Sequence, residues 1–152
     1  MKVLLQRVSR AEVRVGGERV ASIGRGLLAL VAVEHGDTEA TVDFLADKTA
    51  ELRIFPDESR PMNRSALDDG LEVLVVSQFT LAGSTRKGRR PSFTAAAPPE
   101  EAERLYRRFA ARIGERGLRV SSGVFRANME VELVNDGPVT VLLDPPGPEG
   151  SG

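Results

Sequence analysis

The stretch that organises the chain is Asn135-Asp136-Gly137-Pro138-Val139-Thr140. It lies between two apolar runs, Met129–Val134 and Val139–Leu143, and both have the composition of strands. Proline has no backbone N–H and a fixed φ, so it marks a turn or an edge of a sheet. Glycine before it has no Cβ, which lets another group approach the backbone closely. The Gly-Pro dipeptide is therefore predicted to join two strands, and the residues leave its cis or trans state open.

The first part of the chain is predicted to supply further strands of the same sheet. Val3–Val8 is apolar and β-branched, and Arg10–Val15 alternates strictly between charged and apolar residues. Gly16-Gly17 is typical of a hairpin turn, and Arg19–Ile23 would be the returning strand. Leu27–Val33 is a continuous apolar run, which indicates a strand buried on both faces.

Two long helices are predicted. The first follows the loop His35-Gly36-Asp37-Thr38, in which Asp37 or Thr38 can cap the helix by accepting from its first free N–H groups, and it runs to about Leu52. The second begins at Pro99, because proline is favoured in a first helical turn, and stops near Gly117. The buried stripe of this second helix is predicted to comprise Ala102, Leu105, Tyr106, Phe109, Ala110 and Ile113.

Shorter elements complete the prediction. Asp68-Asp69-Gly70 indicates a turn, and Leu71–Val76 indicates a buried strand that continues through Ser77–Leu81. Leu118–Ser121 is predicted to form a short strand. The fold class is α+β, with a mostly antiparallel, strongly curved sheet that carries the two helices. Residues 1–144 are expected to form one domain, and the proline- and glycine-rich residues 145–152 a disordered tail.

Composition narrows the possible functions. The chain has 152 residues, of which 41% are hydrophobic and 28% charged, and its net charge is −1. Any nucleic-acid contact must therefore come from a local basic patch. The chain has no cysteine, no apolar run long enough to span a membrane and no secretory signal at its start, which together fit the cytoplasm. With His35 as the only histidine, a zinc site of the His/Cys type is excluded, and we expect no metal and no cofactor.

One strand end has the residues expected of a reaction site. Ser77-Gln78-Phe79-Thr80-Leu81 ends a buried run with a hydroxyl, an amide, an aromatic ring and a second hydroxyl. Such an end can present backbone N–H groups to a developing oxyanion, with Phe79 as an apolar wall. A solvated edge strand explains the same residues equally well. His35 lies in a polar turn, which favours a solvated side chain over the base of a catalytic triad.

A basic loop follows this strand end. The residues from Ser84 to Phe93 contain Arg86, Lys87, Arg89 and Arg90 around Gly88. Cationic side chains near a glycine and an aromatic ring are typical of a loop that contacts phosphates, although a solvated run of charge is the common alternative. The patch could continue along the next helix, through Arg104, Arg107, Arg108 and Arg112.

Taken together, these stretches resemble one family, the D-aminoacyl-tRNA deacylases (D-tyrosyl-tRNA deacylases). Four segments match the family in its own order, and they span nearly the whole chain. The segments are Leu5–Ala11, Val76–Leu81, Thr85–Phe93 and Val134–Thr140. Four ordered motifs are far more specific than any one of them.

The resemblance implies a homodimer that hydrolyses the ester between a D-amino acid and tRNA, and also glycyl-tRNA mischarged on non-cognate tRNA. In the family the Gly-Pro bond is cis and enters the partner's pocket, so Gly137 and Pro138 would reject L-amino acids and Arg7 would support them. The catalytic pocket would be lined by Ser77, Gln78, Phe79, Thr80, Phe125 and Met129. The tRNA 2′-OH would assist hydrolysis, and the basic loop, Arg86–Arg90, would bind tRNA.

The chain also departs from the family pattern. Arg126 stands where the family usually has a small residue, often glycine, so either the pocket rim differs or a phosphate contact is added. Ala82-Gly83-Ser84 replaces the commonest Tyr-Ala-Asp form. A sister branch with a trans Gly-Pro edits L-alanine mischarging, but it lacks the Ser-Gln-Phe-Thr-Leu motif, so D-specificity is favoured. Two other functions stay open, a non-catalytic RNA-binding module using the Arg86–Arg90 loop and a small-ester hydrolase with Thr80 as nucleophile.

Overall fold

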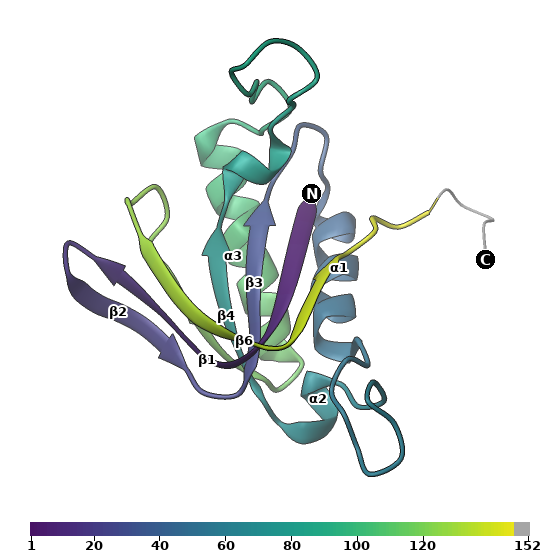
Figure 1. Cartoon of the computed structure of the whole chain (residues 1–152). Helices are drawn as coiled ribbons and strands as arrows, with labels where there is room; N and C mark the ends of the chain where they lie inside the picture. Colours follow the sequence, from purple (N-terminus) through teal and green to yellow (C-terminus); the bar gives the residue numbers. More distant parts are fainter. Residues whose placement is uncertain (148–152) are drawn as a thin grey trace.

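The computed structural model of the chain describes residues 1–147 and shows one curved sheet with two long helices behind it (Figure 1). The strand order is β2-β1-β3-β4-β5, and β6 pairs with the other edge of β1. The strands are β1 (Lys2–Val15), β2 (Glu18–Ile23), β3 (Gly26–Ala32), β4 (Glu72–Ser77), β5 (Arg119–Ser122) and β6 (Glu130–Leu142). The predicted barrel-like sheet with two long helices is confirmed.

The first strand, β1, holds the sheet together because it pairs with three others. Its first half runs antiparallel to β3 and its second half antiparallel to β2, while β6 follows it along the opposite side. The sequence predicted two strands here, but the backbone continues through Ser9 as a single one. Gly16 and Gly17, with φ values of 58° and 82°, make the predicted hairpin turn into β2.

The sheet is mixed, with a larger parallel part than the sequence suggested. Strands β3, β4 and β5 are parallel neighbours. Parallel strands need long connections, and here α1 (Glu39–Glu51) lies in the first connection and α3 (Pro99–Glu115) in the second. Both helices match the prediction. The Thr38 hydroxyl accepts a hydrogen bond from the Thr41 N–H, and Gly117 follows the end of α3 with a φ of 102°.

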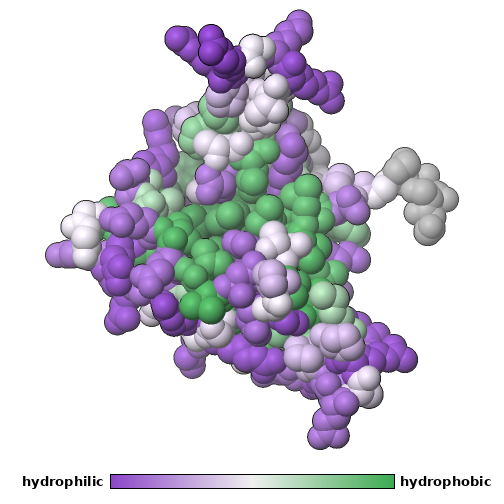
Figure 2. Space-filling model, viewed as in Figure 1, coloured by the Kyte–Doolittle hydropathy of each residue, from purple (hydrophilic) through white to green (hydrophobic). Residues whose placement is uncertain are grey.

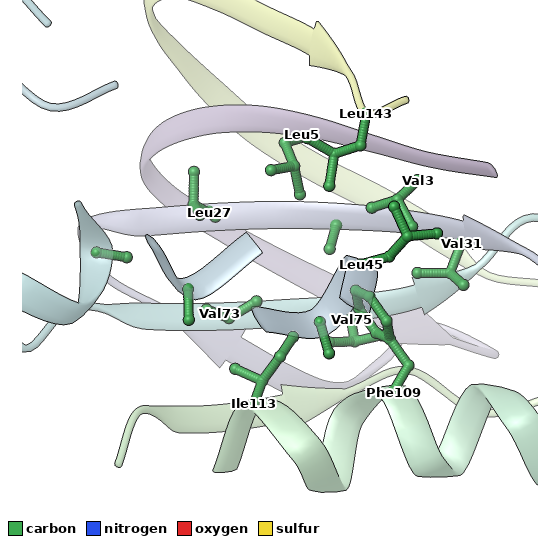
Figure 3. Packing of buried hydrophobic residues seen from close by; sticks show 14 of the residues in the cluster. Val3, Leu5, Leu27, Val31, Leu45, Val73, Val75, Phe109, Ile113 and Leu143 are labelled. Atoms are coloured by element: carbon green, nitrogen blue, oxygen red, sulfur yellow. The ribbon is translucent and has the colours of Figure 1, made fainter. Parts of the chain in front are cut away.

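The sheet buries both of its faces, which explains why β3 and β4 are apolar without alternation. On the helix side, Leu27 and Val73 pack with Leu45 of α1 and with Phe109 and Ile113 of α3 (Figure 3). On the other, concave side, a second cluster joins side chains of β1, β2, β3 and β4. Its buried members are Val8, Ala11, Val13, Ile23, Leu28, Leu74 and Val76.

The Gly-Pro stretch does not join two strands as predicted, because β6 runs through it as one strand. The register places Gln6 opposite Thr140 but Val8 opposite Asn135. Residues 136–139 therefore stand opposite Arg7 alone and bulge out of the ladder. A proline is tolerated here because β6 is an edge strand and need not donate on its outer side. The Gly137-Pro138 bond is cis.

Two shorter predictions were also wrong. Ser77–Leu81 does not prolong β4 as a strand, because the chain turns at Gln78 into a 3-10 helix, η1 (Phe79–Ala82). Asp68-Asp69-Gly70 belongs to a one-turn helix, α2 (Ala66–Asp69), rather than a simple turn. Ser65 and Asp68 form a capping box at its start, and Gly70 ends it in the left-handed region.

Residues 145–147 have no regular structure, and the rest of the predicted disordered tail falls outside the described residues. No helix within residues 1–147 is long and apolar enough to cross a membrane.

Candidate active site

A cavity of about 540 Å³ opens at the carboxyl ends of β3 and β4, the edge at which parallel sheets commonly bind ligands. The structure brings together here five of the predicted site residues, Ser77, Gln78, Phe79, Phe125 and Met129. The apolar remainder of the wall comes from the ends of β3 and β4, the start of α3 with the segment before it, and the start of β6 with the segment before it. It comprises Val33, Val76, Ala96, Ala97, Pro99, Ala102, Ala127 and Val131.

The turn from β4 into η1 fixes the polar side of the cavity. The Gln78 N–H donates to the Val31 carbonyl at 2.7 Å, which ties the turn to β3. The Gln78 Nε2 donates to the Thr80 hydroxyl, and the exposed Thr80 is not among the residues that line the cavity. Within the described part of the chain, the N–H groups of Phe79 and Thr80 have no hydrogen-bond acceptor. These are the first donors of a helix, which lack intrahelical partners.

Phe79 connects the cavity to the basic loop. Its side chain is 56% exposed and meets Phe93 edge-on, with 5.2 Å between ring centroids. Gly83 makes this contact possible, because a Cβ there would lie 2.8 Å from the Phe93 ring. Ser84 and Ser92 close the base of the loop by two backbone hydrogen bonds. An aromatic surface at the cavity mouth is thus joined to the cationic loop.

The opposite wall is held by a residue that the sequence assigned only to the core. Tyr106 of α3 lies 5.8 Å, centroid to centroid, from Phe125, and its hydroxyl donates to the Val75 carbonyl at 2.9 Å. Burial raises the pKa of Tyr106 above its usual value, so the hydroxyl stays a donor. Gly123 leaves room for Met129, whose sulfur would lie 2.7 Å from a Cβ at that position.

Asn128 also lines the cavity, although the sequence did not predict it as a site residue. The only signal in the sequence is that it is a polar residue next to Met129.

Gly137 and Pro138 are exposed and do not line the cavity of their own chain. Arg7 lies beneath them, with only 9% of its surface exposed. Its Nε donates to the Asp136 carbonyl at 2.9 Å and its Nη1 to the Ile54 carbonyl at 2.7 Å. From the other side the Asn135 side chain accepts from the Val139 N–H at 3.0 Å. The bulge is therefore fixed in an outward-facing position.

The basic loop projects away from the sheet and ends in strongly hydrophilic side chains (Figure 2). Arg86, Lys87, Arg89 and Arg90 are exposed, and within residues 1–147 none of them forms an ion pair. Gly88 turns the tip with a φ of 65°. The loop therefore presents its full charge to solvent.

The expected continuation of this patch along α3 was wrong. The arginines expected to extend the patch each contact a carboxylate. Most of these carboxylates are on α1, where acidic residues recur every four residues and face the arginines of α3. The closest pairs across the two helices are Arg104–Glu39 at 2.8 Å, Arg108–Asp43 at 2.8 Å, Arg112–Asp47 at 2.9 Å and Arg116–Glu51 at 2.6 Å. Arg107 pairs with Glu103 on its own helix. These charges form an ion-pair ladder between α1 and α3.

The cavity wall contains one charged side chain, that of Arg126. No carboxylate or histidine lines it, and residues 1–147 contain no group of three or more His, Cys, Asp or Glu side chains that could hold a metal. His35 is exposed, and its backbone N–H donates to the Ala95 carbonyl at 3.0 Å in the loop before α3. The site offers a wall without acidic groups, two free backbone N–H donors at the start of η1 and an aromatic rim.

The site thus combines a cavity at a parallel sheet edge, two free backbone N–H donors beside it and a neighbouring cationic loop. The family described as D-Tyr-tRNA(Tyr) deacylase matches residues 4–144. The chain therefore belongs to the D-Tyr-tRNA(Tyr) deacylase family, a family of hydrolases, as the sequence predicted.

Individual relatives agree with this assignment. The chain is 60% identical to a D-aminoacyl-tRNA deacylase of Thermomicrobium roseum, over 95% of this chain and 94% of that protein. It is 56% identical to a D-aminoacyl-tRNA deacylase of Symbiobacterium thermophilum, over 95% of both. Among solved structures, a c-Myc DNA unwinding element binding protein superposes with a TM-score of 0.89 at 40% identity, covering 97% of this chain and all of that one.

Proposed function

We propose that the chain hydrolyses the ester bond of D-aminoacyl-tRNA and releases the free D-amino acid and tRNA. It would also act on glycyl-tRNA mischarged on non-cognate tRNA, since glycine lacks the side chain that is rejected. One observation carries the proposal: a cavity without acidic groups is lined by Phe79, whose N–H is free like that of the adjacent Thr80, in a chain of the deacylase family. The curated relatives are named for the same substrate class.

The chemistry needs only positioning and oxyanion stabilisation, because an aminoacyl ester is already activated. The N–H groups of Phe79 and Thr80 would donate to the developing oxyanion of the ester carbonyl. No protein base lines the cavity, so the 2′-OH of the terminal adenosine, next to the 3′-ester, would orient the attacking water. Phe125 and Met129 would hold the adenosine against the apolar wall.

Discrimination against L-amino acids would come from Gly137 and Pro138 of a second copy of the chain. Two observations support this arrangement: the dipeptide lies on the outer edge strand, and it stands outside the cavity of its own chain. Val134 and Leu142, both on β6, are 41% and 57% exposed, so the edge offers apolar surface to a homodimer partner. Rigid backbone projecting into the partner's cavity would exclude an L side chain by steric clash.

The basic loop would bind the tRNA backbone near its acceptor end. Its four unpaired cations can neutralise phosphates, and Phe93 joins it to the cavity wall at Phe79. A protein that acts on tRNA in this way would work in the cytoplasm.

The test is deacylation of D-Tyr-tRNA and L-Tyr-tRNA by the purified protein. We expect rapid release of D-tyrosine and release of L-tyrosine at the uncatalysed rate. The Phe79→Pro variant lacks one of the two N–H donors and also the ring that meets Phe93, and Phe79→Leu, which loses only the ring, is its matched control. Failure to accelerate release of D-tyrosine at any enzyme concentration would contradict the proposal.

A second candidate is a nucleic-acid-binding module without catalysis. It is favoured by the exposed loop and by the structural likeness to a protein named for DNA binding. The deacylation assay separates the two, because a binding module would retain tRNA without releasing the amino acid. A small-ester hydrolase with a Thr80 nucleophile is less consistent with the structure, since Thr80 is exposed outside the cavity and bonded to Gln78.

A further inference from the structure

Arg126 holds a backbone conformation that arginine rarely adopts. Its φ is 67°, and within residues 1–147 it is the only residue other than glycine with a positive φ. The Ala127 N–H donates to the Val124 carbonyl at 3.2 Å, so Val124–Ala127 form a four-residue turn with Arg126 in third place. A turn with a positive φ only at its third residue is of type II, which favours glycine or asparagine there. Local structure alone therefore does not explain the arginine.

Arg126 is also the single charged residue in the lining of the cavity. The residue is exposed, and no carboxylate within residues 1–147 lies within ion-pair distance of it, in contrast to the paired arginines of α3. Strained residues persist at ligand sites when their side chain is needed there. An unpaired guanidinium beside a neutral cavity is suited to an anionic group of the ligand, and phosphate matches its fork of donors.

The proposed substrate has such an anion at a fixed distance from the reacting carbonyl. The ester is on the 3′ oxygen of the terminal ribose, and the phosphate is on the 5′ oxygen of the same ribose. If the aminoacyl group and adenosine occupy the cavity, this phosphate lies at its edge, where Arg126 stands. The loop cations cannot take this place, because none of Arg86, Lys87, Arg89 and Arg90 lines the cavity.

We infer that Arg126 binds the 5′-phosphate of the terminal adenosine and thereby positions the ester against the N–H groups of Phe79 and Thr80. The inference rests on the proposed function and adds a specificity contact to it. It distinguishes this site from one that recognises only the aminoacyl-nucleoside. Arg126 is a positioning residue, since it does not touch the reacting atoms.

The test compares two small esters that differ by one phosphate: D-tyrosyl-adenosine and its 5′-monophosphate. With the wild-type chain we expect the phosphate to lower KM by about tenfold, the effect of one charge-assisted contact, with kcat nearly unchanged. In Arg126→Asn and Arg126→Gly the two esters should have equal KM values, close to that of wild type with D-tyrosyl-adenosine. Arg126→Lys should recover part of the phosphate effect, because it keeps the charge.

Two controls separate this role from a structural one. Asparagine and glycine both accept the left-handed conformation, so their melting temperatures should equal or exceed that of wild type. Arg119→Asn removes an exposed arginine of β5 outside the cavity and should keep the wild-type phosphate effect. An unchanged phosphate effect in Arg126→Asn would overturn this inference alone. A wild-type chain inert toward both esters and toward D-Tyr-tRNA would overturn the proposed function itself.

Discussion

Arg7 and Asp136 lie 129 residues apart in the sequence, and the Arg7 Nε donates a 2.9 Å hydrogen bond to the Asp136 carbonyl. The same guanidinium reaches the Ile54 carbonyl, so one side chain links the first strand, the last strand and the loop after α1. Lysine cannot reproduce this arrangement, because its ammonium is a single point donor on a flexible stem. The position of the Gly-Pro bulge therefore depends on Arg7.

Replacing Arg7 by lysine should reduce both stability and stereochemical selectivity. Two buried or partly buried carbonyls lose a charged donor, at a cost of about 1–3 kcal/mol. A looser bulge should admit L-amino acids, so hydrolysis of L-Tyr-tRNA should rise relative to D-Tyr-tRNA. Arg10→Lys, on the same strand but exposed and paired with Glu132, is the control. Unaltered D over L selectivity in Arg7→Lys would refute this role.

Replacing Gly137 by alanine should abolish activity and lower stability only moderately. A Cβ there would lie 2.7 Å from the Val139 side chain and 2.9 Å from its backbone nitrogen, at a φ of 138°. The bulge must shift, at a cost of about 1–3 kcal/mol for a strained residue, yet no core side chain is lost. Circular dichroism melting and deacylation of D-Tyr-tRNA check the two effects. A Gly137→Ala chain with wild-type turnover would count against the assigned role of the dipeptide.

Neutralising the basic loop should weaken tRNA binding and flatten its dependence on salt. Each phosphate contact that is lost lowers the log–log slope by about 0.7–0.9. The variant with Arg86, Lys87, Arg89 and Arg90 all changed to glutamine should therefore differ strongly from wild type in a salt titration of tRNA affinity. The double variant Arg104→Gln with Arg107→Gln removes exposed arginines that are paired with carboxylates, and its salt dependence should equal that of wild type. Equal slopes in the loop variant and wild type would mean that the loop is merely solvated.

The proposed mechanism predicts that tRNA ending in 2′-deoxyadenosine binds normally but is deacylated about 10²-fold more slowly, the effect of a positioned general base. Thr80→Ala should keep most of its activity, because its backbone N–H remains. Single-turnover deacylation of both D-aminoacyl-tRNAs measures these rates. Equal rates on the two tRNAs together with an inactive Thr80→Ala chain would favour a threonine nucleophile instead.

The ion-pair ladder between α1 and α3 should make stability depend on acid pH. Hydrogen bonding from Arg112 and Arg116 holds the pKa of Asp47 below its usual value in the folded chain. A carboxylate with a lowered folded pKa stabilises the fold above its unfolded pKa of about 4, and this contribution is lost as pH falls through the folded value. Asp47→Asn should therefore lower the free energy of unfolding by about 0.5–1 kcal/mol at pH 7. It should have no effect at a pH low enough to protonate the Asp47 carboxyl in both the folded and the unfolded chain. Urea titrations at pH 7 and at low pH, with and without added salt, check this.

Much of the fold could be predicted from local patterns. The Gly16-Gly17 hairpin, the Thr38 cap and the Pro99 helix start each depend on a few adjacent residues, and all are confirmed. The predictions that failed concern segments whose structure depends on residues far away in the sequence. The sequence of 135–140 indicates a turn, but Arg7 and the ladder with β1 keep β6 continuous across it. The α3 arginines look like free cations until α1 places carboxylates beside them.

The site was partly predictable for a similar reason. The residues Ser77, Gln78 and Phe79 come from one motif, and the cavity does gather them with Phe125 and Met129. The supporting role of Tyr106 could not be read from its apolar helical stripe, because that stripe is also what a core helix requires. The backbone strain at Arg126 depends on φ, which no residue pattern specifies.

Because β1 pairs with β6, the sheet cannot be completed during translation until β6 has left the ribosome. The strand β1 is made before all the others, but β6, its partner along one whole edge, is made after β2 to β5, and Leu143 beyond it donates to the Val3 carbonyl at 2.9 Å. Until then the nascent chain carries an open, partly apolar strand edge, which is a template for pairing with other chains. This edge is closed only when β6 pairs along β1.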